Sequence, residues 1–328
     1  MANSISSVYG VVAIGRNEGD RLKQCLSSLS LVSPLIYVDS GSTDGSANLA
    51  RNYGAEVVEL DASRRFTAAR ARNAGYKRLL EIRPDLQFIQ FIDGDCELIP
   101  QWLELASSFL AAHEQVGAVF GRRRERYPTL SVYNQLCDWE WDGPIGEGAS
   151  FGGDVMIRTS ALVASGGYRE DVIAGEDTEL CLRLRSANWP SWRLNAEMTI
   201  HDAAITTFSQ WWRRSVRCGY AFAQGAHLHG SSPERHFIWE SRRARAWGIW
   251  IPLGCLGAIL ILGPWGSVTC LVYPLQVVRQ IFRTRGSTLN RLTLGIFQVL
   301  ARFPEAWGQI KFTYDRLARR PAQIIEYK

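Results

Sequence analysis

Short apolar runs alternate with segments of helical periodicity over the first third of the chain. Apolar runs that predict strands cover residues 8–14, 35–38, 56–60, 87–92 and 116–121. Between them, residues 20–30, 44–53 and 67–82 predict helices, the first with Leu22, Leu26 and Leu29 at helical spacing. This alternation predicts an α/β fold with a mostly parallel sheet and helices on both faces. In such sheets, ligands bind beyond the carboxyl ends of the strands.

The pattern becomes looser after residue 121. Residues 139–154 (WEWDGPIGEGASFGGD) are rich in glycine and acidic residues and predict an irregular segment. Helices are predicted over residues 178–186 and 207–225. We therefore assign residues 1–230 to one catalytic-type domain and residues 231–328 to a helical C-terminal region.

That C-terminal region contains an uncharged run over residues 246–278. The sequence GPWG at residues 263–266 divides it into two pieces, each shorter than the ~20 residues needed to cross a bilayer. Arginines flank both ends of the run, which predicts that it enters a membrane and returns on the same side. A single kinked crossing helix and a buried hairpin of a soluble protein are the alternatives. Residues 289–312 look amphipathic, as a helix lying on a membrane surface would.

Charge is divided unevenly along the chain, whose net charge is +5. Residues 201–328 carry +11 (17 Lys+Arg against 6 Asp+Glu), and residues 1–200 carry −6 (20 against 26). A basic tail indicates nucleic acid or anionic lipid, or only a solvated basic surface. Next to the apolar run, lipid accounts for it better, and we expect no nucleic-acid partner. The seven cysteines stand singly with no C-x-x-C pair, which is typical of a reducing cytosol.

Carboxylates follow the predicted strand FIQFID. Asp93 and Asp95 are separated by Gly94, which lets the backbone approach a ligand closely. Carboxylate oxygens suit hard cations such as Mg²⁺ or Mn²⁺, which in turn bridge phosphates. An acidic turn is the alternative. The position at a strand exit favours a metal-dependent phosphate site.

Two further segments carry groups that suit a nucleotide. Asp39 ends the strand in LIYVDSGSTDGS, where a carboxylate can accept from ribose hydroxyls or a base N–H. In FTAARARNAG, Arg70 and Arg72 are two residues apart and cannot share a helix face. One of them can reach a diphosphate while the other meets solvent, since arginine suits phosphate oxygens.

The segment AGEDTELCLRL places Glu176 and Asp177 at a helix start. Acidic residues are favoured there by the helix dipole and as caps, whatever their function. The functional interpretation is a general base, because a sugar hydroxyl is a poor nucleophile near neutral pH until a carboxylate takes its proton.

Taken in order, VVAIGRNE, VDSGSTDGS, ARNAG, DGD, GGDVMIRTSAL and GED resemble the family 2 glycosyltransferases over about residues 8–225. The resemblance implies a GT-A fold and inverting transfer of a sugar from a nucleotide-sugar, with UDP the expected nucleotide. It implies that Asp39 binds the nucleoside, that Asp93 and Asp95 handle metal and diphosphate, and that Arg72 helps to hold the diphosphate. Asp177 would be the base, with Glu176 supporting it.

His201, in TIHDA, lies where some GT-A enzymes place a histidine that binds the metal, although a lone histidine is often structural. Gln210-Trp211-Trp212-Arg213-Arg214 resembles the Q-x-x-R-W motif of processive synthases, with Arg214 in place of the last tryptophan. This departure favours addition of a single sugar. Trp139 and Trp141 are candidate platforms for a sugar face, and packing is the equal alternative. Arg213 and Arg214 are candidates to receive the phosphate of a lipid-linked acceptor.

The preferred hypothesis is a glycosyltransferase at the cytoplasmic face of a membrane that extends a lipid-linked glycan for surface polysaccharide. Transfer directly to a polyprenyl phosphate and a catalytically silent membrane scaffold are the alternatives. A nicotinamide-binding protein is disfavoured, because no G-x-G-x-x-G follows the first strand.

Overall fold

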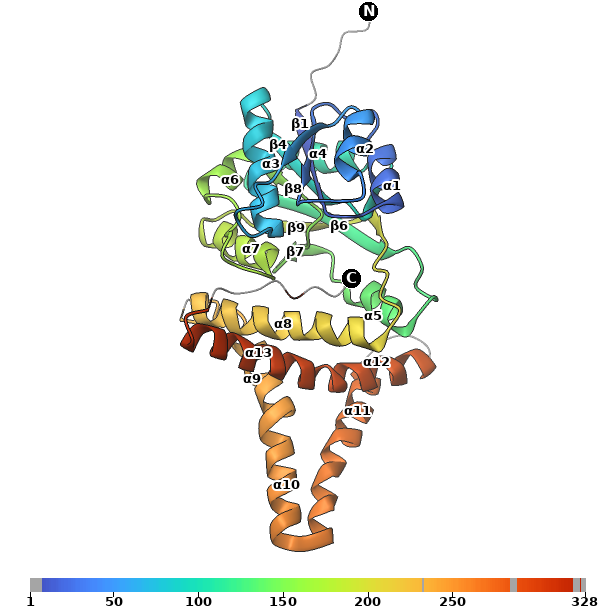
Figure 1. Cartoon of the computed structure of the whole chain (residues 1–328), viewed down its shortest axis with the longest axis vertical. Coiled ribbons are helices and arrows are strands. Elements are labelled where there is room, and N and C mark those ends of the chain that lie inside the picture. The colour runs from blue at the N-terminus through green and yellow to red at the C-terminus, as the bar shows by residue number, and fades with distance from the viewer. Residues whose placement is uncertain (1–7, 232, 284–287, 321–324, 326–328) are drawn as a thin grey trace, which may run out of the picture. The chain divides into compact units, whose positions relative to one another are not determined.

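A computed structural model of the chain describes residues 8–231, 233–283, 288–320 and 325 (Figure 1). The chain forms two compact units: the first is Met1–Thr129 with Cys137–Ala204, and the second is Leu130–Leu136 with Ile205–Lys328. The division after residue 204 places the helix predicted at residues 207–225 in the C-terminal unit, although the sequence suggested a boundary after residue 230.

A nine-stranded mixed sheet forms the centre of the first unit in the described part of the chain. The strands are β1 (Tyr9–Gly15), β2 (Leu35–Asp39), β3 (Glu56–Glu59), β4 (Phe88–Asp93), β5 (Cys96–Leu98), β6 (Ala118–Glu125), β7 (Gly146–Gly148), β8 (Val155–Arg158) and β9 (Ser191–His201). Their order is β3-β2-β1-β4-β8-β6-β9-β5, and β7 pairs with β9. The first four strands are parallel, as predicted, whereas β8 is antiparallel to both β4 and β6.

Helices cover both faces of this sheet, as predicted (Figure 1). They are α1 (Asp20–Ser28), α2 (Ser46–Asn52), α3 (Ala68–Ile82), α4 (Trp102–Ala112), α6 (Thr159–Ala164) and α7 (Glu176–Ser186). The residues of α5 (Val132–Glu140) are divided between the two units. Successive side chains of β1 point to opposite faces: Val11 and Ala13 join the core under α1 and α4, while Val12 and Ile14 join the core under α3, α6 and α7. Strands buried on both faces explain the continuous apolar runs in the sequence.

The parallel strands bring their carboxyl ends to one edge of the sheet. β1 pairs with both β2 and β4, so that Gly15 lies opposite Asp39 and Ile14 lies opposite Asp93. β9 brings His201 to the same region, since His201 pairs with Cys96 on β5. The carboxylates predicted at the exits of β2 and β4 therefore flank the carboxyl end of β1.

The second unit is helical in its described residues. Its helices are α8 (Phe208–His229), α9 (Ile238–Arg245), α10 (Ile251–Leu262), α11 (Val272–Arg283), α12 (Thr288–Leu300) and α13 (Arg302–Leu317), with a π-helical turn η1 (Ala246–Trp250) and a 3₁₀ segment η2 (Gly263–Leu271). α8 and α13 approach closely at two glycines: a Cβ on Gly219 would lie 1.9 Å from the Glu305 carbonyl oxygen, and one on Gly308 would lie 2.1 Å from that of Val216. Larger residues would force these helices apart.

The apolar run folds back on itself. α10 and α11 form two arms joined by η2, as Figure 1 shows, and the bend contains the GPWG sequence that was predicted to divide the run. The helical stretch Ile238–Phe282 is long and apolar enough to cross a membrane, and only 6% of its most apolar window is buried. Low burial argues against the buried hairpin of a soluble protein.

Candidate active site

Arg72 is the centre of a buried ionic cluster in the first unit. α3 places it there because Thr67 caps the helix with its side chain and fixes the first turn. Its Nη2 donates to Asp93 Oδ1 at 2.8 Å, and its Nη1 lies 2.8 Å from Glu176 Oε1 and 3.1 Å from Asp177 Oδ1. One guanidinium thus joins the carboxylate at the exit of β4 to the two carboxylates at the start of α7.

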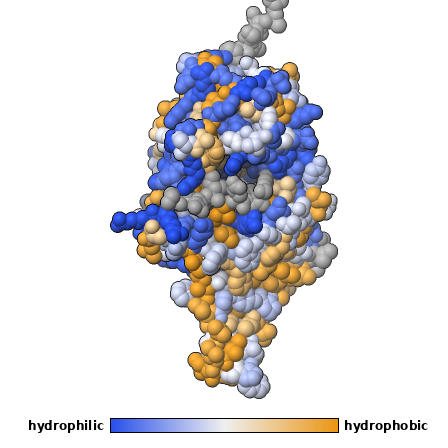
Figure 2. Space-filling view, in the orientation of Figure 1, coloured by the Kyte–Doolittle hydropathy of each residue, from blue (hydrophilic) through white to orange (hydrophobic). Residues whose placement is uncertain are grey.

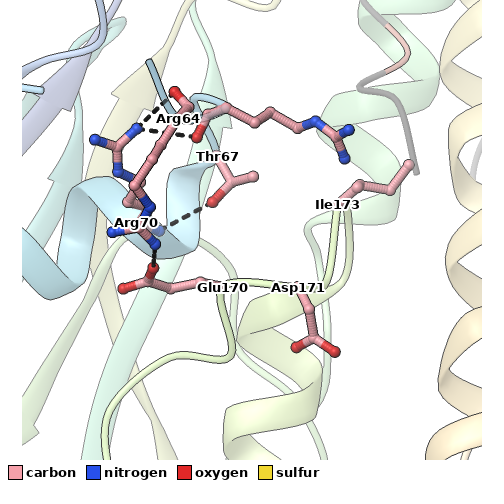
Figure 3. A pocket seen from close by; sticks show the side chains of 7 residues that line it. Arg64, Thr67, Arg70, Glu170, Asp171 and Ile173 are labelled. Atoms are coloured by element: carbon pink, nitrogen blue, oxygen red, sulfur yellow. Dashed lines mark hydrogen bonds and ion pairs between the residues drawn. The ribbon is translucent and has the colours of Figure 1, made fainter. Parts of the chain in front are cut away.

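Arg70 lies on another face of α3, as the two-residue spacing predicted. It is buried, however, and does not meet solvent. Its guanidinium donates to the carbonyl oxygens of Asp61, Arg64 and Arg65, and so it holds the preceding loop (Figure 3). The expectation that the second arginine is solvated was therefore wrong, because unpaired loop carbonyls take up its donors.

A pocket of about 280 Å³ lies beside this loop and is lined by Arg64, Arg65, Thr67, Arg70, Glu170, Asp171 and Ile173 (Figure 3). Arg64 pairs with Glu170 across it at 2.9 Å. Because the candidate site residues from the sequence do not line this pocket, we place the chemistry in the ionic cluster around Arg72.

Arg123 on β6 is a second, half-buried cation in the cluster. Its Nη2 lies 3.2 Å from Asp93 Oδ2 and 2.7 Å from Asp154 Oδ2. Asp154 is fully buried, and it also accepts from the Asp93 backbone N–H and the Thr199 hydroxyl. Burial alone would raise the pKa of Asp93, but Arg72 and Arg123 outweigh it and lower that pKa, so the carboxylate stays ionised.

Sequence reasoning missed the roles of Arg123, Asp154 and Gly153. Arg123 lies in GRRRER, which resembles an ordinary solvated basic strand end, and only the fold turns it inward. Asp154 and Gly153 belong to the GGD sequence that contributed to the family resemblance, so a signal existed. A Cβ on Gly153 would lie 2.4 Å from Arg72 Nη2 and 2.5 Å from Asp93 Oδ2, which explains the need for glycine.

Asp95 and His201 provide donor atoms suited to a metal ion. His201 Nε2 lies 3.3 Å from Asp95 Oδ2, and one ligand atom each from Asp95, Cys96 and His201 lie within 4.8 Å of one another. Burial would lower the pKa of His201, but Asp95 outweighs it and raises that pKa, so this position favours positive charge. Burial raises the pKa of the Cys96 thiol well above its usual value. The protonated thiol leaves oxygen and imidazole donors, which suit Mn²⁺ and, less well, Mg²⁺.

Asp177 has the electrostatics of a proton acceptor. Burial raises its pKa to about 8, with Glu176 and Asp93 adding to the shift and Arg72 opposing it. The residue is the second of α7, which begins after Gly175, whose φ of 79° is a left-handed conformation that favours glycine. A carboxylate with a raised pKa binds a proton more strongly near neutral pH than an ordinary aspartate.

Asp39 lies at the carboxyl end of β2, as predicted. One of its oxygens accepts from the backbone N–H groups of Gly41 and Ser42, and the other accepts from the Tyr37 hydroxyl at 3.3 Å. These bonds fix the carboxylate and shape the Ser/Gly loop after it. Arg16 lies with its guanidinium carbon 5.6 Å from the centroid of the Phe66 ring, beside the same loop.

The structure separates the two candidate tryptophans. Trp141 packs edge-on against the His201 ring, with centroids 4.7 Å apart, and Arg123 lies over its indole at 5.5 Å. Its loop is held by Asp142, which pairs with Arg122 at 3.0 Å and with Arg193 at 3.4 Å. Trp139 is exposed. Trp141 therefore belongs to the cluster.

Arg213 and Arg214 lie on α8, in the second unit. Gln210 accepts from backbone N–H groups of Thr206 and Thr207 in a capping box, and Trp211 stacks with Tyr133 and packs edge-on against Phe297. In this chain, the first residues of the Q-x-x-R-W-like sequence thus start and anchor a helix.

Comparison with known proteins shows which family part of the chain resembles. Residues 11–163 match the model of glycosyl transferase family 2. The succinoglycan biosynthesis protein ExoA of Rhizobium meliloti is 25% identical over 206 residues, 59% of this chain and 61% of that protein. The glycosyltransferase AglE of Haloferax volcanii is 22% identical over 254 residues, 73% of this chain and 78% of that protein. The chain thus spans about three fifths of the first of these relatives.

A solved structure shares the fold. The mannosyltransferase PcManGT of Pyrobaculum calidifontis, in complex with GDP-Man and Mn²⁺, is similar with a TM-score of 0.59 and 18% identity, covering 94% of this chain and 87% of that chain. At this identity the likeness concerns the fold. The chain has the GT-A fold, as the sequence resemblance implied, and its residues 11–163 are similar to glycosyl transferase family 2.

Proposed function

We propose that this enzyme transfers a sugar from a nucleotide-sugar, with inversion, to a hydroxyl group of a lipid-linked glycan in surface polysaccharide synthesis. One observation carries the proposal: the buried guanidinium of Arg72 contacts both Asp93, on the side of the strand exits, and Asp177, the carboxylate with the raised pKa. Arg72 thus links Asp93, which we place at the donor diphosphate, to Asp177, which we propose as the base. A single displacement step requires the donor and the base to lie close together.

The donor end is formed by the strand exits. Asp39 is fixed by its loop and can accept from a ribose hydroxyl or a base N–H of the nucleoside, for which we propose UDP. Arg72 and Arg123 hold Asp93 from both sides and bring two guanidinium groups to this edge of the sheet. Guanidinium groups so placed offset the charge that develops on a departing nucleoside diphosphate.

The residues present fit a divalent cation, Mn²⁺ or Mg²⁺. Asp95 and His201 would hold it, because their ligand atoms are adjacent and their position favours positive charge. Asp93 would lie next to it, with both of its oxygens also bonded to arginines. When bound, the cation adds to the neutralisation of the diphosphate. The naming of Mn²⁺ in the PcManGT complex is consistent with this choice.

Asp177 takes the proton from the acceptor hydroxyl as that oxygen attacks the anomeric carbon in line. Its raised pKa matches the task, since it binds a proton strongly near the pH of the cell. Glu176 supports Asp177 indirectly, because it shares Arg72 Nη1 with it and adds negative charge. Trp141 packs against the His201 ring at the cluster, and we propose that it contacts a face of the sugar.

Features of the second unit support the proposed acceptor and location. Arg213 is exposed on α8 and Arg214 is half-buried beside it, and we assign them to a phosphate of the lipid-linked acceptor. The apolar helical stretch supports a site of action at the cytoplasmic face of a membrane. The name of ExoA, a succinoglycan biosynthesis protein, supports polysaccharide synthesis as the process.

Asp177→Asn tests the acceptor chemistry. If the acceptor is a hydroxyl, sugar transfer falls about 10²–10⁴-fold, while nucleotide-sugar binding persists. If the variant transfers at the wild-type rate, the acceptor is a lipid phosphate, which needs no base, and the hydroxyl proposal is wrong. Absence of any nucleotide-sugar binding by the wild-type chain would instead support the silent scaffold.

A further inference from the structure

The two arms α10 and α11, with η1 and η2, form a hairpin over residues 246–282 whose surface is mostly hydrophobic (Figures 1 and 2). Leu260, Ile261 and Trp265 near the bend are each more than three-quarters exposed, with exposed fractions of 77%, 82% and 82%. An exposed patch of this kind marks a contact with a membrane or another protein. Two parts of the hairpin distinguish between these partners: the bend, and the open end opposite the bend, which we call the base of the hairpin.

The bend satisfies its own polar groups. The hydroxyls of Ser267 and Thr269 donate to the carbonyl oxygens of Pro264 and Gly266, at 2.6 and 2.7 Å. A Cβ on Gly266 would lie 2.2 Å from the Ala258 carbonyl oxygen, so the returning chain packs directly on α10. Hydrocarbon offers no partner to a polar group, so hydroxyls that enter it need such internal bonds.

The base of the hairpin carries polar and positive groups. Tyr273 donates its hydroxyl to the Trp247 carbonyl oxygen at 2.8 Å, and the two rings lie 5.8 Å apart, which joins the arms at this end. Arg242 and Arg245 precede the first arm and Arg279 follows Tyr273 on the second, and all three are exposed. Aromatic residues and arginines at one level are typical of a membrane interface with anionic headgroups.

The length of the arms limits the depth of insertion. Residues 246–262 are helical and extend ~26 Å at ~1.5 Å per residue, which is less than the ~30 Å hydrocarbon core of a bilayer. The chain then turns back, so both arginine-bearing ends of the hairpin lie at its base. A single crossing would require charged ends on opposite sides, and a double crossing would require the bend to reach the far surface.

We propose that this hairpin inserts into an anionic membrane from one side, with the bend in the hydrocarbon and Arg242, Arg245 and Arg279 at the lipid headgroups. The inference deepens the membrane location in the proposed function and rests on it. It assigns a lipid bilayer, and not a second copy of the chain, as the partner of the exposed apolar surface.

Flotation of the full-length chain with vesicles tests the partner, using phosphatidylcholine alone and with added phosphatidylglycerol. We expect tighter binding to the anionic vesicles, and an affinity for them that falls about 10–30-fold in R242Q/R245Q, or roughly fivefold for each arginine. L260R/I261R changes two exposed side chains and should abolish flotation with both vesicles. R64Q/R65Q, in the first unit, is the matched control and should float like the wild type.

Nucleotide-sugar binding, measured on each variant, distinguishes a lost lipid contact from a lost fold or a failed functional proposal. Flotation without nucleotide-sugar binding would overturn the proposed function and leave the hairpin inference intact. Flotation of L260R/I261R like the wild type would overturn the hairpin inference, as would a stable dimer without lipid that this variant disrupts.

A cysteine at the bend tests insertion from one side. In W265C on a C270S background, a charged maleimide should label residue 265 neither from outside the vesicle nor when trapped inside it. Position 265 should react with the charged maleimide once the vesicles are dissolved and the chain is unfolded in denaturing detergent. Labelling by the trapped reagent would show a crossing hairpin, and labelling from outside would show that the bend remains in water. Either result would overturn the proposal.

Discussion

Arg72 Nη1 lies 3.1 Å from Asp177 Oδ1, so the guanidinium that we place at the donor diphosphate also contacts the carboxylate that we propose as the base. The same side chain pairs with Asp93 and Glu176 and is almost fully buried. Donor binding and the basicity of Asp177 are therefore coupled through one residue. The negative charge of a diphosphate bound at Arg72 weakens the attraction between Arg72 and Asp177.

Replacing Arg72 with methionine should destabilise the protein strongly, because three carboxylates lose a buried partner. We expect the free energy of unfolding to fall by about 3–5 kcal/mol, measured by urea denaturation of the full-length chain. Arg64→Gln breaks an exposed pair with Glu170 and should cost less than about 1 kcal/mol. Equal effects of the two substitutions would contradict the central role of Arg72.

The pH dependence of transfer should report Asp177. Because the base must be ionised and its pKa is raised to about 8, kcat/KM should rise about tenfold per pH unit below pH 8 and level off above it. The measurement is the initial rate from pH 5.5 to 9.5. A rise in kcat/KM centred near pH 4, or an unchanged rise near pH 8 in Asp177→Asn, would exclude Asp177 as the base.

The raised pKa also affects stability. Asp177 ionises near pH 4 in the unfolded chain but keeps its proton to about pH 8 in the folded protein. The folded state thus binds more protons between these values, and this group's contribution to stability is lost as pH rises through that window. Asp177→Asn should raise Tm relative to the wild type at pH 8 but not at pH 4. A difference independent of pH would argue against the shift.

Two adjacent glycines offer a matched test of packing in the site. Gly153→Ala places a methyl group against Arg72 and Asp93, so we expect at least tenfold weaker nucleotide-sugar binding by titration calorimetry. A Cβ on Gly152 meets nothing within 4 Å, and Gly152→Ala should bind like the wild type. If both variants bind normally, the Arg72–Asp93 pair does not contribute to the donor site.

Substitution of Trp141 and of Trp139 tests which tryptophan contributes to the site. Trp141→Ala removes the ring that contacts Arg123 and His201, and we expect Mn²⁺ and nucleotide-sugar affinity to fall about 3–30-fold, the range of a cation–π contact of about 0.7–2 kcal/mol. Trp139→Ala should leave both affinities unchanged, since Trp139 is exposed. The reverse order would assign the platform to Trp139.

The sequence predicted the first half of the fold well, because β1, β2 and β4 are buried on both faces and form continuous apolar runs. β8 was missed, since its four residues run directly into α6 without a turn signal. β9 was missed as well, because eleven residues that include Asn195 and Glu197 do not resemble a buried strand. The three-residue strands β5 and β7 were missed too, and each of the four missed strands has an antiparallel pairing in the sheet.

The candidate site was predictable where a residue follows a strand or opens a helix. Asp39, Asp93 and Asp177 were proposed in this way, and the structure brings Asp93 and Asp177 together at Arg72. Arg123 could not be found, because its neighbours Arg122 and Arg124 are also arginines and only pairing across the sheet turns one of them toward Asp154. Asp154 is a buried partner of Arg123, and a single sequence does not show which aspartates are buried.

The central claim is that Asp95 and the strand exits around it form a metal-dependent nucleotide-sugar site. The most direct measurement is a titration of the purified full-length chain with a panel of nucleotide-sugars, with and without Mn²⁺, repeated for Asp95→Ala and for the exposed control Asp85→Ala. We predict Mn²⁺-dependent binding of one nucleotide-sugar that is lost in Asp95→Ala and kept in Asp85→Ala. Binding that is indifferent to Mn²⁺ and to Asp95, or no binding in detergent and in lipid, would contradict the account.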